Sequence, residues 1–175
     1  MFEIIALIVV VLIAGVLLYA TTKPDTFRVQ RSISIKAQPE KIFPLINDFH
    51  NWAAWSPWEK IDPLLKRTYS CSAQGQGAVY EWDGNNKVGT GRMEIIEIAP
   101  PFKVLIKLDF IKPFEGHNIA EFTLEGIGGS TNITWAMYGP TRYIAKVMSL
   151  FMDCDNMVGP QFETGLANMK AVTEK

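Results

Sequence analysis

Apolar and polar residues alternate along most of the chain from residue 27 onward. In the segment FRVQRSISIK, residues 27–36, the apolar residues that share one face of an extended chain are Phe27, Val29, Ile33 and Ile35. A period of two predicts a strand with one buried face. The same pattern, interrupted by turn residues, predicts further strands at 67–73, 78–84, 87–99, 102–111, 117–127 and 130–139.

Short runs of glycine, asparagine and aspartate separate these predicted strands. The sequence Asp83-Gly84-Asn85-Asn86 and the pair Gly128-Gly129 are typical of hairpin turns, so we expect neighbouring strands to pair antiparallel. Gly89 and Gly91 resemble half of a phosphate-binding motif, but they lie inside a predicted strand. A bulge or a sharp bend of the sheet explains them better.

Helical periodicity is confined to three places in the soluble part. Pro39-Glu40 predicts the start of a short helix that continues to residue 49, and a second short helix or turn covers 50–55 and ends at Ser56-Pro57. Near the C-terminus, helices are predicted over 142–157 and 161–175, with Gly159-Pro160 as a break. The last helix has an apolar stripe that includes Phe162, Leu166 and Met169.

The order of these elements predicts an α+β fold. An antiparallel sheet with one polar face must cover its other face, and the C-terminal helix is the only long cover available. A curved antiparallel sheet wrapped around this helix would leave a gap between the two layers. Such a gap is a natural ligand cavity.

The N-terminus follows a different pattern, because residues 4–20 (IIALIVVVLIAGVLLYA) contain no charge. As a helix this run would be about 26 Å long, close to the roughly 30 Å hydrocarbon core of a bilayer. A cleaved signal peptide is the alternative, but Met1-Phe2-Glu3 supplies no positive charge and no Ala-x-Ala follows the run. We therefore expect a single-pass transmembrane anchor.

The expected organisation is an anchor at 1–22, a tether at 23–26 and one folded domain at 27–175. Lys23, Arg28 and Arg31 lie on the C-terminal side of the anchor, whereas Glu3 precedes it. The positive-inside rule then places the folded domain in the cytoplasm. The short tether should hold it close to the membrane surface.

Composition narrows the class of function. The formal net charge is −1 and the sequence pI is about 6.1, so the chain lacks the basic character of a nucleic-acid-binding protein. Cys71 and Cys154 are far apart and form no metal-binding motif. We expect free thiols, no metal site and no cofactor.

Several segments resemble one known family. The opening segment SISIKAQPEKIFPLINDFHNWAAWSPW has an apolar strand, a Pro-Glu helix start and a Trp-x-x-Trp-Ser-Pro-Trp turn. This opening, together with YEWDGNNKVGTGRMEI, FIKPFEGHNIAEFTL, TNITWAMYGP and MVGPQFETGLANMK, resembles the START-like (SRPBCC) superfamily of polyketide cyclases, dehydrases and lipid-transport proteins. The resemblance covers nearly everything from Phe27 onward and implies the helix-grip fold. It does not imply one activity, because that fold carries binders, cyclases and co-chaperone-like activators.

Strand parity predicts which side chains would line the cavity. Trp52 and Trp55 come from a cluster of three tryptophans in eleven residues, which either plugs one end of the core or borders the cavity mouth. The complete set of predicted ligand-binding residues is Trp52, Trp55, Tyr80, Trp82, Met93, Phe110, Phe122, Trp135, Met137, Phe162, Leu166 and Met169. Each of these could also be an ordinary core residue. The large number of apolar side chains, and the adaptable shape of methionine among them, favour an apolar guest.

Groups that could carry out acid–base chemistry are few. His117 and Glu121 share one face of a predicted strand, and Tyr80 is a further candidate, yet exposed polar residues on a strand are the simpler interpretation. No catalytic triad, phosphate loop or pair of catalytic carboxylates is present in the sequence pattern.

The function that we expect is therefore a membrane-anchored domain that binds a hydrophobic small molecule or a lipid in an internal cavity, without changing it. Its partners would be that ligand and the membrane, with no nucleic acid. A polyketide cyclase- or dehydratase-like enzyme is one alternative, and it needs an acid–base group that points into the cavity. A regulatory domain that binds a protein partner is the other.

Overall fold

The chain from residue 26 onward is built on one seven-stranded antiparallel sheet. A computed structural model describes residues 2–151 and 153–175. The strand order is β1-β7-β6-β5-β4-β3-β2, so consecutive strands from β2 to β7 are neighbours and β1 closes the other edge against β7. The strands are β1 (Thr26–Ile35), β2 (Lys66–Cys71), β3 (Ala78–Asp83), β4 (Thr90–Ala99), β5 (Lys103–Lys112), β6 (Gly116–Ile127) and β7 (Ser130–Pro140).

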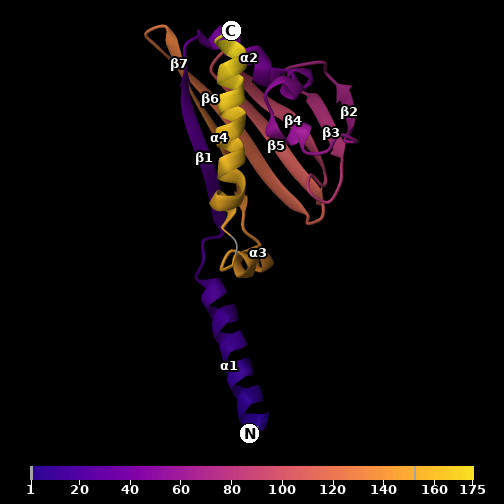
Figure 1. Ribbon diagram of the computed structural model, residues 1–175, viewed down its shortest axis with the longest axis vertical. Helices are drawn as coiled ribbons and strands as arrows, with labels where there is room; N and C mark the ends of the chain where they lie inside the picture. The colour runs from indigo at the N-terminus through magenta and orange to yellow at the C-terminus, as the bar shows by residue number, and fades with distance from the viewer. Residues whose placement is uncertain (1, 152) are drawn as a thin grey trace.

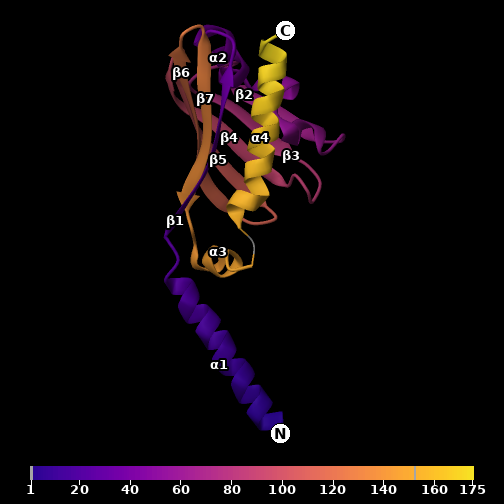
Figure 2. The same cartoon turned by 60° about the vertical axis from the view of Figure 1, so that its left-hand side comes forward.

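The helices are placed on one face of the sheet and at one end of the molecule. They are α1 (Phe2–Thr21), α2 (Pro39–Asn47), the 3-10 helices η1 (Phe49–Ala54) and η2 (Pro57–Lys60), α3 (Tyr143–Met148) and α4 (Cys154–Thr173). The sheet curves around α4, while α1 projects away from the domain and α3 lies between α1 and the sheet (Figure 1). A second view shows the same arrangement, with the two termini at opposite ends (Figure 2). This is the helix-grip arrangement.

The predicted alternation places the core where the sequence indicated. Ala120, Phe122 and Leu124 of β6 are buried on the concave face, and Val104 and Ile106 of β5 pack beside them. The outer face of the sheet carries most of the charged side chains, such as Lys107 and Glu121, which belong to the opposite parity. The observed burial of every second residue therefore confirms the predicted half-buried strands.

Gly91 lies at an irregularity of the sheet, as predicted, whereas Gly89 precedes β4 instead of lying inside a strand. Gly89 has a φ of +72°, and the β4–β5 register shifts between Thr90 and Gly91. A Cβ at Gly91 would lie 2.3 Å from the ring of Trp82, so only glycine lets the indole cross the strand at this point.

The C-terminal helices differ from the prediction in two respects. The first predicted helix, 142–157, ends at Met148 in α3, and the predicted break at Gly159-Pro160 lies inside α4. Asp153 caps α4 by accepting a hydrogen bond from the backbone N–H of Asp155 at 3.0 Å, so the helix begins before the proline.

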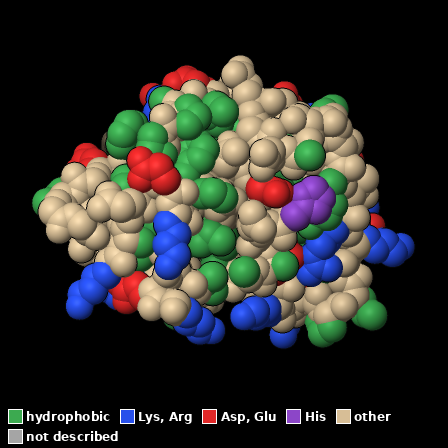
Figure 3. Space-filling model, turned by 90° about the horizontal axis from the view of Figure 1, so that it is seen from above, with side chains coloured by type: hydrophobic (Ala, Val, Ile, Leu, Met, Phe, Trp, Pro, Cys, Tyr) green, Lys and Arg blue, Asp and Glu red, His purple; other side chains and the backbone are tan. Residues whose placement is uncertain are grey.

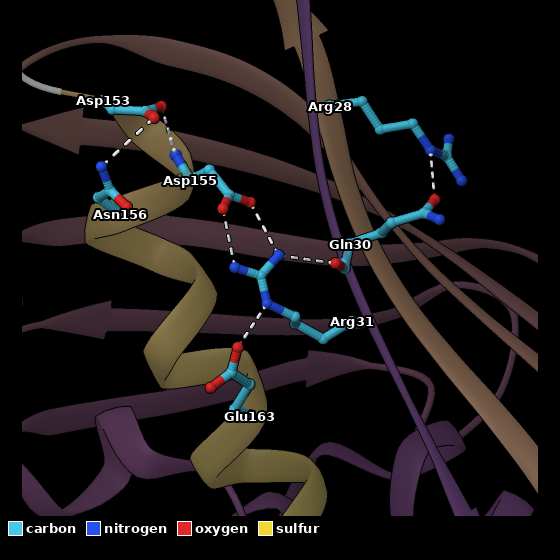
Figure 4. Close-up of polar contacts among 7 residues, drawn as sticks. All are labelled: Arg28, Gln30, Arg31, Asp153, Asp155, Asn156 and Glu163. Carbon is cyan, nitrogen blue, oxygen red and sulfur yellow. Dashed lines mark hydrogen bonds and ion pairs between the residues drawn. The ribbon is translucent and has the colours of Figure 1, made fainter.

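Arg31 of β1 explains how α4 continues past Gly159-Pro160. Its guanidinium binds both carboxylate oxygens of Asp155 at 2.8 Å and one of Glu163 at 2.6 Å (Figure 4). A Cβ at Gly159 would lie 2.1 Å from Arg31, so the glycine makes room for the guanidinium between the two carboxylates. This contact joins the turns before and after Pro160, and it offsets the backbone hydrogen bond that proline cannot donate.

Candidate functional site

The candidate site is the apolar interior between the concave face of the sheet and α4. All twelve residues predicted to line a cavity lie in or against one hydrophobic cluster: eleven are buried, and Phe110 is half-buried. The structure thus brings the predicted set together from β3, β4, β5, β6, β7, η1 and α4. Whether these residues bind a ligand stays a prediction.

Trp135 of β7 is at the centre of this cluster. Its ring stacks on Phe162 of α4 with centroids 4.1 Å apart and an interplanar angle of 8°, and on Phe122 of β6 at 4.9 Å. Trp52 and Trp55 meet Trp135 edge-on at 6.5 and 5.3 Å. Stacked and edge-on pairs are both favourable arrangements of aromatic rings. We call this group of packed rings, Trp52, Trp55, Phe122, Trp135 and Phe162, the tryptophan block.

The end of α2 holds two of the tryptophans in place. Trp52 donates its indole N–H to the carbonyl of Ile46 at 3.0 Å, and Trp55 donates to that of Leu45 at 2.8 Å. These carbonyls belong to the last turn of α2, which leaves acceptors free. The tryptophan cluster therefore plugs the end of the core beside α2, which was one of its two expected roles.

Trp58 is a member of this interior that the predicted set omits. It lies on η2, a 3-10 helix absent from the sequence prediction, and contacts Trp135 at 5.5 Å and Phe162 at 6.0 Å. Trp52, Trp55 and Trp58 recur at every third residue, which is the spacing of a 3-10 helix, although Trp52 lies on η1, Trp55 directly follows η1 and Trp58 lies on η2. This spacing is the feature that could have identified it.

The interior is filled at the level of Trp135. A Cβ at Gly165 of α4 would lie 2.9 Å from the Trp135 ring, so the helix already touches the rings of the sheet. Two hollows of the described residues, of about 220 and 400 Å³, are open depressions on or beside the outer face, and both include Tyr138 and Gly139. Neither contains any of the twelve predicted residues. The structure therefore shows packed rings at the place of the predicted preformed gap.

Burial is slightly less complete at the end of the interior where β7 leads into α3, which we call the looser end. Trp82, Met93, Leu108 and Met137 retain a small exposed fraction there, and Phe110 is half-buried, whereas Trp55 and Phe122 at the level of η1 are fully buried. Of these strands, β7 leads directly into α3. The apolar interior is one continuous cluster from the tryptophan block to the looser end.

One polar group is aimed into this apolar interior without a partner. Trp135 is buried, and its indole nitrogen has no hydrogen-bond partner among the described residues. An unpaired buried N–H costs free energy and usually has a structural or functional reason. It could donate to an oxygen of a guest molecule.

Tyr80 is buried as well, but its hydroxyl is already bound. It donates to Glu59 at 2.6 Å, and Arg67 donates to the other carboxylate oxygen of Glu59, also at 2.6 Å. Burial and then the hydrogen bond to Glu59 raise the pKa of Tyr80 well above its ordinary value, so the phenol stays protonated. The trio joins η2 to β2 and β3 and has a structural role.

His117 and Glu121 lie on the outer face of the sheet. His117 contacts Asp109 at 2.7 Å, and the hydrogen bond to that carboxylate raises the pKa of the imidazole. Glu121 lies 4.0 Å from Arg28. Neither side chain reaches the interior, so these two residues do not supply the inward acid–base group that the enzyme alternative requires. Among the described residues, no group of three His, Cys, Asp or Glu side chains could hold a metal ion.

Comparison with known proteins agrees with this architecture. Residues 26–174 match the model of the family described as polyketide cyclase / dehydrase and lipid transport, and the chain belongs to this family. The family is associated with the binding of hydrophobic ligands and lipids. A search of curated proteins found no match.

Solved structures of low sequence identity share the fold. They include the protein CV1439 from Chromobacterium violaceum, with 15% identity, 87% of this chain and 99% of that chain covered, and a TM-score of 0.60. Ginseng major latex-like protein 151 from Panax ginseng has 12% identity, coverage of 87% and 100%, and a TM-score of 0.62. The Aha1 dimer from Colwellia psychrerythraea has 18% identity, coverage of 85% and 96%, and a TM-score of 0.57.

Proposed function

We propose that this protein is a membrane-anchored domain that binds a hydrophobic small molecule or a lipid between the sheet and α4, without chemically changing it. The observation that carries the proposal is the continuous apolar interior, which runs from the tryptophan block to the looser end beside α3. The family association with hydrophobic ligands points to the same class of guest.

The guest would enter at the looser end and displace side chains there. Met93 and Met137 line that end, and methionine changes its shape at little cost. Each methylene of the guest that leaves water contributes roughly 0.8 kcal/mol. The unpaired N–H of Trp135 would donate a hydrogen bond to one oxygen of the guest and so fix its orientation.

The anchor in this proposal is α1, followed by the tether at 23–26 and the domain at 27–175. The helix spans Phe2–Thr21, and nearly all of its apolar side chains are exposed, as expected for a helix whose natural surroundings are lipid. Lys23 and Arg28 follow it and favour a cytoplasmic domain by the positive-inside rule. Arg31 is bound to Asp155 and Glu163, so it belongs to the domain rather than to the membrane flank.

A matched pair of variants tests the binding site. Met137 faces the interior and Tyr138, its neighbour, faces outward. The full-length chain is purified in mild detergent, and bound hydrophobic compounds are measured per protein by mass spectrometry. We expect Met137→Trp to reduce the bound guest severalfold by filling its space, whereas Tyr138→Trp leaves it unchanged. Equal occupancy in both variants would place the guest elsewhere, on α1 or on the surface.

A regulatory domain that binds a protein partner is the second candidate function. The filled interior at Trp135 favours it, because a domain of this kind needs no room for a guest. The same measurement separates the two, since this candidate predicts that the wild-type chain carries only the detergent and lipid that surround α1.

A further inference from the structure

The segment after β7 has an unusual distribution of polar and apolar side chains. The buried residue of α3 is Lys146, with 8% of its surface exposed, whereas Ile144 is 73% exposed and Phe151, just after the helix, is 77% exposed. Ile144, Met148 and Phe151 follow a spacing of four and three residues, so they form one apolar stripe on the outside. In water this arrangement is unfavourable, because the charge is inside and the large apolar groups are outside.

A specific interaction keeps this inverted arrangement in place. Lys146 donates to Asp25 of the tether at 2.5 Å, and this hydrogen bond holds the pKa of the Asp25 carboxyl below its usual range. The lysine therefore fixes which side of α3 faces the tether. The apolar stripe is consequently turned outward.

The position of α3 relative to α1 indicates what covers the stripe. The hydroxyl of Tyr143 donates to the carbonyl of Leu17, in the last turns of α1, at 2.9 Å. Ala20 of α1 is fully buried where the two helices pack together. Both ribbon views place α3 directly beyond the end of α1 (Figures 1 and 2).

The length of α1 sets the depth of this contact. Twenty residues make a helix of about 30 Å, which matches the roughly 30 Å hydrocarbon core of a bilayer. The last turns of α1 would then lie at the boundary between acyl chains and headgroups, and α3 would lie at the same level. Apolar side chains of interfacial helices are buried at this depth.

We propose that the stripe Ile144–Met148–Phe151 docks onto the same lipid bilayer that holds α1. This inference rests on the membrane anchoring in the proposed function and adds a second contact to it. Two contacts would fix the orientation of the domain, with the looser end of its interior toward the lipid. The looser end would then be able to exchange an apolar guest with the bilayer without exposing that guest to water.

Depth measurements on the full-length chain in lipid nanodiscs test this docking. Native cysteines are removed as Cys71→Ser and Cys154→Ser, and single NBD fluorophores are attached at Ile144→Cys or Phe151→Cys. The matched control is Ile127→Cys, because Ile127 is 66% exposed and is the last residue of β6, next to the β6–β7 turn at the end of the domain opposite α1. That opposite end carries charged side chains among scattered hydrophobic groups (Figure 3). A further label at Val10→Cys, in the middle of α1, reports on anchoring by itself.

We expect lipids with a quencher near the headgroup to quench the labels at 144 and 151, and aqueous dithionite to reduce these labels severalfold more slowly than the label at 127. If the labels at 144 and 151 react like the label at 127 while deep-lying quenchers reach position 10, the docking is wrong and the anchoring stands. If position 10 is not quenched either, the anchoring falls as well. Protection from dithionite without quenching by lipid would mean that protein covers the stripe, which also overturns the proposal.

Discussion

Trp135 shows how a single residue can be both a core residue and a candidate contact for a ligand. Its ring is held between Phe122 and Phe162, yet its N–H has no partner among the described residues. Sequence parity identified the ring as inward-facing, but it could not reveal the unpaired nitrogen. Hydrogen bonding depends on which backbone carbonyls come near, and that is a property of the folded chain.

His117 gives a prediction on pH dependence at the residue scale. The hydrogen bond to Asp109 raises the pKa of His117 in the folded protein, so its contribution to stability is fully present below the ordinary value of about 6.5. This contribution is lost as the pH rises through the raised pKa. As the pH rises, the free energy of unfolding of the wild type should fall when His117 loses its proton. We expect His117→Gln to abolish this fall, as measured by urea unfolding at several pH values.

His50→Gln is the matched control, since His50 lies on η1 and contacts Asp48 instead. The role assigned to His117 fails if His117→Gln and His50→Gln change the pH profile of unfolding in the same way.

Arg31 carries the main prediction at the level of elements. It links β1 to α4 on both sides of Gly159, and the hydrogen bond from Arg31 lowers the pKa of Asp155. We expect Arg31→Met to loosen the N-terminal half of α4, so that amide hydrogen exchange at residues 155–163 becomes severalfold faster. Arg28→Met is the control, because Arg28 lies on the opposite face of β1, over the ring of Tyr138.

The same contact predicts sensitivity to acid. The lowered pKa of Asp155 stabilises the fold above its ordinary pKa of 3.8, and this contribution disappears as the pH falls through the lowered value. Wild-type α4 should therefore loosen in acid, whereas the Arg31→Met variant should be loose already at neutral pH. Equal exchange in the wild type and in Arg31→Met at neutral pH would contradict the role of Arg31.

The strands could be predicted from the sequence more completely than the helices. Alternation over ten residues is a local property, and all seven predicted strands are present within a few residues of their predicted ends. The C-terminal helices depend instead on Lys146 and Arg31, whose partners Asp25 and Asp155 are distant in the sequence, as well as on the local cap at Asp153. For this reason, the sequence predicts a break at Gly159-Pro160, whereas α4 continues through both residues.

At the scale of the whole molecule, the sequence predicted the helix-grip fold but not how closely the sheet packs against α4. Parity identifies which side chains face inward, and the structure confirms that the predicted set shares one interior. The room left between those side chains depends on ring orientations and on how closely Gly165 lets α4 approach Trp135. Neither quantity is encoded in a pattern of apolar positions.

The arrangement of the parts relates the interior to the membrane. The tether pairs with α3 through Asp25 and Lys146, and α3 contacts α1 through Tyr143. The strand β7, which carries Met137 at the looser end of the interior, leads directly into this junction. A guest that comes from the bilayer would therefore have a short path to the apolar interior.

The most direct measurement is methyl NMR of the full-length chain in nanodiscs of deuterated lipid, with labelled methionine methyl groups and protonated oleic acid as the probe. The account predicts nuclear Overhauser contacts from the acyl chain to Met137 and Met93 inside the domain. Contacts with Met148 alone, on the outer stripe of α3, would show that the acyl chain stays in the bilayer and would contradict binding in the interior.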